Sequence, residues 1–135
     1  MDAYRALDNE YLTIDYHPDC ELLKLVWKST SADIKSEEEF KWLLGQVAEI
    51  YETFKPSYVL YDQRKFFFPL TPELQNWINE NLVAILKRIG VKKMAFVLSH
   101  DLFSRISVEQ TLEEAGKLNI KYFEDIDAAQ KWVTK

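Results

Sequence analysis

Two short apolar segments constrain the fold of this chain more than any other feature of the sequence. Residues Tyr58 to Asp62 (YVLYD) and Met94 to Leu98 (MAFVL) are apolar at nearly every position. A strand with one solvated face alternates polar and apolar side chains, so an unbroken apolar run indicates a strand that is buried on both faces. Helical patterns follow both segments, and strands that alternate with helices form a mostly parallel sheet with right-handed crossovers.

The residues before these segments predict an antiparallel hairpin. Tyr11 to His17 and Leu22 to Lys28 both alternate apolar and polar residues, which is the period of a half-buried strand. Pro18 lies between them in a turn sequence. We expect the first strand of this hairpin to form the antiparallel edge of the sheet.

Four amphipathic helices complete the pattern, each with apolar residues at three- and four-residue spacing. Hydroxyl or acidic caps precede three of them, at Ser36, Thr71 and Asp125, and Gly90 ends the second. The sequence predicts helices over about 37–54, 72–89, 105–117 and 126–133, with a short strand at 120–123. The fold class is therefore α/β: a single domain over residues 1–135, with a five-stranded mostly parallel sheet, an antiparallel N-terminal edge strand and four helices.

Composition and charge exclude several classes of protein. The net charge is −5 and the basic residues are scattered among acidic ones, which argues against nucleic acid as a partner. Cys20 is the single cysteine, so there is no internal disulfide and a reducing compartment is indicated. No apolar run approaches the roughly 20 residues of a membrane helix, and the first residues do not resemble a signal peptide. We expect a cytoplasmic protein with no membrane span.

No catalytic, metal or cofactor motif can be assembled from the sequence. The histidines His17 and His100 are separated by most of the chain, whereas a metal site needs several converging ligands. Ser99, His100 and Asp101 are adjacent, and adjacent residues cannot supply the geometry of a catalytic triad. The three glycines are far apart, which removes dinucleotide- and phosphate-binding loops. We expect no enzyme activity and no cofactor; for His100, a place on a ligand rim remains open.

The candidate site is the loop after the first apolar segment. In a parallel sheet, ligands and partners usually sit beyond the carboxyl ends of the strands. Two interpretations of Asp62, Arg64, Lys65 and Thr71 remain open. In the first, Asp62 ties down the loop, Thr71 caps the helix and the cations are solvated. In the second, the helix N-terminus and Arg64 or Lys65 hold a small anion or a charged partner group.

The same loop contains Phe66, Phe67 and Phe68 in succession. Successive side chains of an extended segment alternate in direction, so at least one ring should be exposed or pack on something outside the domain. Two alternatives follow: the loop folds over and buries all three rings, or the rings form a surface for a partner or a second copy. The full set of candidate binding residues is Asp62, Arg64, Lys65, Phe66, Phe67, Phe68, Thr71 and His100.

The element order between Tyr11 and Val133 resembles a known family. It is similar to the STAS (sulfate transporter and anti-sigma antagonist) domain in its SpoIIAA-like branch. The ending Phe123-Glu-Asp-Ile-Asp-Ala-Ala-Gln-Lys-Trp132-Val resembles the final strand, acidic cap and helix of such domains. The resemblance implies a SpoIIAA/STAS-like fold and a non-enzymatic domain that works by binding, in regulation through protein contacts.

The chain departs from this family at its regulatory serine. Anti-sigma antagonists carry a phosphorylatable serine and an Asp-Ser pair at the start of the helix after the third strand. Here Asp62 stands where the strand-ending aspartate belongs, but the loop Gln63 to Leu70 follows it, and Thr71 is the only hydroxyl at the helix start. This departure argues against a switch operated by a kinase.

Two hypotheses of function follow. The first is a STAS-like regulatory module that binds a protein partner through a flat apolar patch. The alternative is a domain that binds a small apolar ligand or lipid in a pocket of a few hundred Å3 under the Phe66–Phe68 loop. We also expect a homodimer. In a SpoIIAA-like sheet the crossover helices lie largely on one face, and the apolar strands would leave the other face undercovered unless a second copy packed there.

Overall fold

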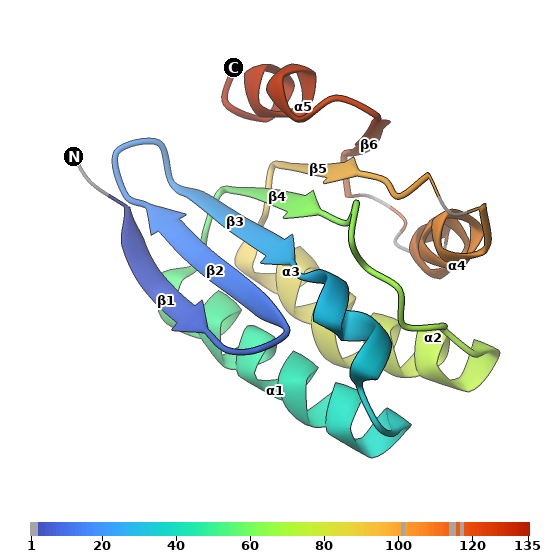
Figure 1. The fold of residues 1–135 in the computed structure, drawn as a ribbon. Helices are drawn as coiled ribbons and strands as arrows, with labels where there is room; N and C mark the ends of the chain where they lie inside the picture. The colour runs from blue at the N-terminus through green and yellow to red at the C-terminus, as the bar shows by residue number, and fades with distance from the viewer. Residues whose placement is uncertain (1–2, 101, 114–115, 117) are drawn as a thin grey trace.

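The computed structural model describes residues 3–100, 102–113, 116 and 118–135, and consists of one six-stranded mixed sheet with helices on both faces (Figure 1). The strands are β1 (Tyr4–Asp8), β2 (Leu12–His17), β3 (Leu22–Trp27), β4 (Tyr58–Asp62), β5 (Lys93–Val97) and β6 (Ile120–Phe123). The helices are α1 (Glu37–Phe54), α2 (Pro72–Ile78), α3 (Ala84–Ile89), α4 (Leu102–Glu113) and α5 (Ile126–Val133). A 3-10 helix covers Ser29–Asp33, and a π-helical segment, Asn79–Val83, joins α2 to α3.

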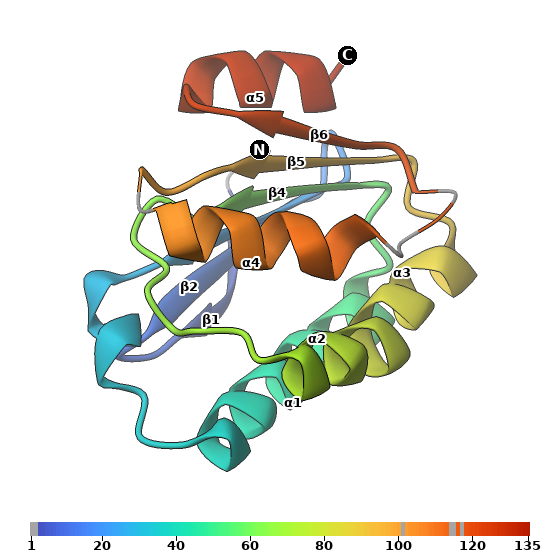
Figure 2. The ribbon, with the colours of Figure 1, turned by 90° about the vertical axis from the view of Figure 1, so that its right-hand side faces the viewer.

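The strands lie in the sheet in the order in which they occur in the chain. The pairs β1–β2 and β2–β3 are antiparallel, and β3 to β6 run parallel. Each parallel connection moves one strand along, and α1, the α2–α3 rod and α4 all lie on one face of the sheet, which we call the helix face (Figures 1 and 2). The α/β class and the parallel arrangement of the later strands are confirmed.

The sheet has six strands rather than the predicted five. Tyr4–Asp8 pairs with β2, so β1 and not the first hairpin strand is the antiparallel edge. This strand lacks a clear alternating pattern, and its register shifts between Arg5 and Leu7. Its pairing depends on backbone hydrogen bonds to β2 and on contacts such as that of Tyr4 with Phe54, whose ring centroids lie 5.5 Å apart. Local sequence does not report such tertiary contacts.

The predicted helix from Pro72 to Gly90 forms, with one irregularity. Thr71 caps its start, and Gly90 ends it with φ 79°, a left-handed conformation that glycine adopts without strain. The π-helical turn in the middle adds a residue per turn, and both Leu82 and Val83 are buried there. The turn thereby changes which side chains of the rod face the sheet.

Among the described residues, α5 is the one helix that covers the opposite face of the sheet, which we call the α5 face (Figure 1). Larger side chains such as Phe123 and Trp132 pack at the border of this contact. Its buried residues are Leu22, Leu60, Ala95, Val97, Ala129 and Val133. Further toward β1, the same face carries partly buried polar residues such as Asp15 and Lys24. The expectation of an undercovered apolar face was therefore wrong, because the C-terminal helix crosses to that side. The homodimer stays a prediction without this support.

Candidate functional site

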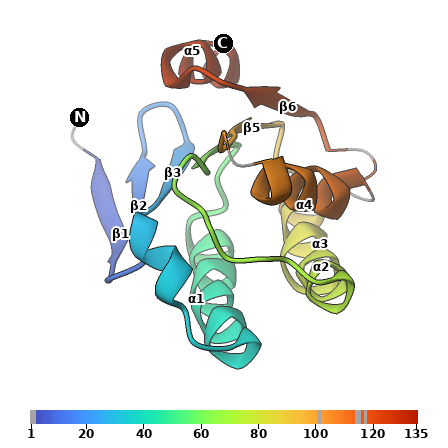
Figure 3. The same ribbon diagram turned by 45° about the vertical axis from the view of Figure 1, so that its right-hand side comes forward.

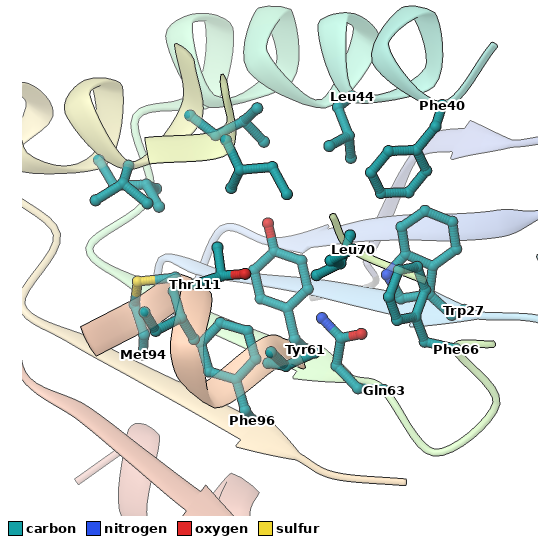
Figure 4. A pocket seen from close by; sticks show the side chains of 16 residues that line it. Trp27, Phe40, Leu44, Tyr61, Gln63, Phe66, Leu70, Met94, Phe96 and Thr111 are labelled. Atoms are coloured by element: carbon teal, nitrogen blue, oxygen red, sulfur yellow. The ribbon is translucent and has the colours of Figure 1, made fainter. Parts of the chain in front are cut away.

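The candidate site is a cavity of about 70 Å3 between the helix face of the sheet and the helices that cover it (Figure 4). Its walls come from β3, β4, β5, α1, the loop after β4, the α2–α3 rod and α4. The lining residues are Trp27, Phe40, Leu44, Tyr61, Gln63, Phe66, Leu70, Ile78, Leu82, Val83, Leu86, Met94, Phe96, Val108, Thr111 and Leu112. The wall is therefore predominantly apolar and rich in aromatic rings.

The strand register builds the sheet side of this cavity. Tyr61 of β4 lies beside Phe96 of β5, and their rings stack with centroids 4.8 Å apart and an interplanar angle of 2°. Because side chains alternate along a strand, Met94 lies on the same face as Phe96. Burial raises the pKa of the Tyr61 hydroxyl well above its ordinary value, which already leaves a tyrosine neutral at pH 7.

The phenylalanine loop closes the cavity on the side of α1. Phe66 and Phe68 are buried, whereas Phe67 is 40% exposed, so the prediction that the three rings cannot all point inward is confirmed. The ring of Phe66 lies 4.8 Å from that of Trp27, and Phe68 stacks on Phe40 at 4.7 Å. Figure 3 shows the loop passing between α1 and α4 on its way to α2.

A buried serine that the sequence did not indicate holds this loop in place. The Ser31 hydroxyl donates to the carbonyl of Lys65 at 2.9 Å and accepts from the backbone N–H of Phe67 at 3.0 Å. Ser31 belongs to the short 3-10 helix after β3 and is fully buried. Two hydrogen bonds from one side chain therefore set which of the phenylalanines face inward.

Two residues of the cavity wall carry buried polar atoms without hydrogen-bond partners. The indole Nε1 of Trp27 and the amide Oε1 of Gln63 are buried and have no hydrogen-bond partner among the described residues. In Figure 4 the Gln63 amide lies between Tyr61 and Phe66, with its oxygen on the side of Phe66 and Trp27. Of the described side chains that line the cavity, none is charged. The site can therefore offer hydrogen bonds to a ligand but no counter-charge.

Asp62 and Arg64 lie on the α5 face and not in the cavity. The Arg64 side chain donates to both carboxylate oxygens of Asp62, at 2.9 and 2.6 Å, and the Arg64 backbone N–H donates at 3.2 Å. Burial opposes ionisation of Asp62, but the hydrogen bonds from Arg64 outweigh it and hold the pKa of the carboxyl below its ordinary value. Lys65 is exposed and lines a surface pocket together with Asp62 and Arg64. This geometry favours the interpretation in which Asp62 ties down the loop.

The other predicted residues lie apart from this pair. The Thr71 hydroxyl accepts from the N–H of Leu74 at 3.3 Å and donates to Glu37 at 3.0 Å. A carboxylate beside this helix start disfavours an anion there. His100 is exposed after β5, and Asp101 lies outside the described residues. The predicted site residues of this loop therefore lie in three places. Phe66 lines the cavity, Thr71 lies at the helix start, and the α5 face carries Asp62, Arg64 and Lys65.

Sequence reasoning missed the polar residues of the cavity, which are Trp27, Tyr61, Gln63 and Thr111. One signal was available: Trp27 ends β3 and Gln63 follows β4, and carboxyl ends of neighbouring parallel strands meet at one edge of a sheet. Their lack of partners, however, depends on residues from several distant segments and is not visible in the sequence.

No family model, no curated protein and no solved structure matches this chain. Within the part of the chain that the structure describes, no helix is long and apolar enough to cross a membrane. Nor do three His, Cys, Asp or Glu side chains gather into a metal-binding group among those residues.

Proposed function

We propose that this protein is a non-enzymatic binding module that holds a small, mostly apolar ligand in the cavity beneath Phe66 and Leu70. The observation that carries the proposal is the pair of buried atoms, Trp27 Nε1 and Gln63 Oε1, that line an apolar cavity without partners. A buried polar group left unpaired costs about 1–3 kcal/mol, and a ligand that pairs with it recovers that free energy. We also propose a cytoplasmic location, because a single cysteine, Cys20, favours a reducing compartment.

The size of the cavity limits what can bind without movement. Its volume of about 70 Å3 falls short of the few hundred Å3 expected for a preformed ligand pocket. A dry cavity of about 150 Å3 is known to admit benzene in another protein. A ligand of that size must therefore displace part of the wall, and the Phe66–Leu70 loop and α4 are the segments that close it.

A hydrogen bond joins the π-helical turn to α4 across the wall of the cavity. The side-chain nitrogen of Asn79, in the π-helical turn, donates to the carbonyl of Thr111 at 2.8 Å and to that of Gln75 at 3.0 Å. π-Helical turns occur frequently at functional sites. Separating α4 from the rod breaks the bond to Thr111, so we expect this bond to restrain opening of the cavity.

Benzene binding tests the proposal. Backbone amide NMR signals of cavity-lining residues should shift when benzene is added to the wild-type protein, and should not shift in Val108→Phe, which fills the cavity. Ile106→Phe is the matched control on the same helix, because Ile106 is 42% exposed and does not line the cavity. Circular dichroism establishes that both variants are folded, since overpacking costs about 1–3 kcal/mol. Equal shifts in all three proteins would contradict the proposal.

A second candidate function is STAS-like regulation through protein contacts, supported by the exposed ring of Phe67 beside Lys65. A homodimer through this loop belongs to the same proposal. Size exclusion coupled to light scattering at tens of micromolar distinguishes the cases. A dimer that Phe67→Asp disperses supports a loop interface, whereas a strict monomer contradicts self-association.

A further inference from the structure

We infer that the ligand of the cavity is an uncharged molecule with a hydroxyl group, and that Trp27 and Gln63 recognise this hydroxyl. The inference rests on the proposed function and adds the chemical class of the ligand. Its basis is the combination of one unpaired donor, one unpaired acceptor and an uncharged wall in the same cavity.

The two unpaired atoms are complementary in what they require. The indole Nε1–H of Trp27 can only donate a hydrogen bond, and the amide oxygen of Gln63 can only accept one. A hydroxyl group both donates and accepts, so one hydroxyl can satisfy both atoms. Figure 4 shows the indole nitrogen and the Gln63 amide directed toward the same part of the cavity. A ligand with only an acceptor or only a donor leaves one of the two unpaired.

The wall excludes charged ligands. A carboxylate or an ammonium group moved into an apolar cavity without a counter-charge is strongly disfavoured. The nearest ion pair beside Gln63 is Asp62 with Arg64, and it lies on the other face of the sheet, because adjacent side chains of a strand point in opposite directions. Tyr61 is neutral at pH 7, as tyrosines ordinarily are, and burial raises its pKa further, so it supplies no charge to the site.

The aromatic wall favours a ring as the apolar part of the ligand. Tyr61 and Phe96 stack as a flat pair, and Trp27 and Phe66 pack at 4.8 Å across the loop side. Aromatic rings pair by offset stacking and by edge-to-face contact, and all these rings line the same cavity. Phenol is therefore the simplest probe with both required features. Toluene has the same shape without the hydroxyl, and benzoate adds a negative charge.

The experiment measures the affinities of phenol, toluene and benzoate by NMR titration of the full-length protein at pH 7. Phenol should bind and shift the indole N–H signal of Trp27, and benzoate should bind at least about ten-fold more weakly than phenol. The ratio of phenol affinity to toluene affinity should fall about ten-fold in Gln63→Leu and in Trp27→Phe, because each loses a hydrogen bond to the hydroxyl.

Matched controls are available elsewhere in the chain. Trp42→Phe changes a tryptophan that is 64% exposed on α1, and Gln130→Leu changes an exposed glutamine on α5. Both should keep the wild-type ratio. Toluene binding by Gln63→Leu and Trp27→Phe shows that their cavity is still formed, so a lost preference for phenol cannot be ascribed to unfolding.

The outcomes separate this inference from the proposed function. If toluene and phenol bind but the ratio does not change in either cavity variant, the inference is overturned and the apolar binding site stands. If benzoate binds as tightly as phenol, the claim that the ligand is uncharged is overturned, and the apolar binding site again stands. If none of the three probes binds, both the inference and the proposed function are overturned.

Discussion

The two faces of the sheet are packed in different ways. On the helix face, large aromatic side chains such as Trp27, Tyr61 and Phe96 meet around a cavity, and buried polar atoms are left without partners. On the α5 face, small residues such as Ala95 and Ala129 pack closely, and the buried carboxylate of Asp62 is fully paired. Small side chains let α5 approach the sheet closely, whereas bulky rings from several elements cannot fill every space between them.

Asp62 and Gln63, adjacent at the end of β4, show the difference between the two faces. Asp62 lies on the α5 face and receives hydrogen bonds from Arg64, while the Gln63 amide oxygen lies on the helix face without a partner. The α5 face therefore stabilises the fold, and the helix face is the one on which we expect binding. The following predictions test this division, beginning with the largest effect.

A charge placed under α5 should unfold the protein if that face is as closely packed as we describe. Ala129 is fully buried against the sheet, and Ala129→Glu should lower the free energy of unfolding by about 4 kcal/mol or more. Ala128→Glu, at the exposed neighbouring position, should change it by less than about 0.5 kcal/mol. Urea unfolding measures both. A mild effect of Ala129→Glu would mean that α5 does not dock firmly.

Adding one methylene to a buried side chain should change the free energy of unfolding in opposite directions on the two faces. Val97→Ile on the α5 face should lower the free energy of unfolding by about 1–3 kcal/mol, because Val97 is fully buried against α5. Val83→Ile extends into the cavity of the helix face and should raise it by up to about 0.8 kcal/mol. Thermal and urea unfolding of the two variants provide the comparison. The same sign for both would remove the distinction between the faces.

The loop between the faces ends at a helix cap that should be structural. Thr71→Ala removes the hydroxyl that accepts from the N–H of Leu74 and should lower the free energy of unfolding by about 1 kcal/mol. Thr71→Ser keeps the cap and serves as the control. Ligand binding in the cavity should be unchanged in Thr71→Ala, because Thr71 does not line it. A Thr71→Ala protein with altered affinity for benzene would show that the cap also positions the cavity wall.

The smallest expected effect concerns the pH dependence that Asp62 contributes. The pKa of Asp62 is lower in the folded protein than in the unfolded chain. Its contribution to the free energy of unfolding is therefore complete above the unfolded pKa of about 3.9, and is lost as the pH falls through the folded pKa. Asp62→Asn should lower the free energy of unfolding at pH 7 by about 1 kcal/mol or less, since Arg64 is partly exposed.

Urea unfolding of Asp62→Asn and wild type across pH 2–7 measures this effect. The difference between the two proteins should shrink below about pH 4. A difference that is constant over this range would show that the pair with Arg64 does not hold the carboxylate ionised.

The sequence by itself determined most of the secondary structure. Period-two alternation, apolar stripes and caps such as Ser36, Thr71 and Asp125 are local signals, and the structure has side-chain hydrogen bonds at all three caps. The exception is β1, whose five residues carry no clear pattern and pair only because the edge of β2 is available. The π-helical turn at Asn79–Val83 was likewise not predicted. A continuous α-helix and a helix with one π-helical turn place apolar residues at similar spacing.

Only the tertiary structure decided where the candidate site lies. The sequence directed attention to the loop after β4, but not to which of its side chains face inward, because this depends on the hydrogen bonds of Ser31, a distant residue. It also could not show that Trp27 and Gln63 lack partners, since a polar group is satisfied or unsatisfied by what surrounds it in space. The sequence also did not show that α5 packs on the α5 face, because that packing is a contact between distant segments. Local patterns specify elements, whereas cavities and unpaired atoms arise from how distant elements meet.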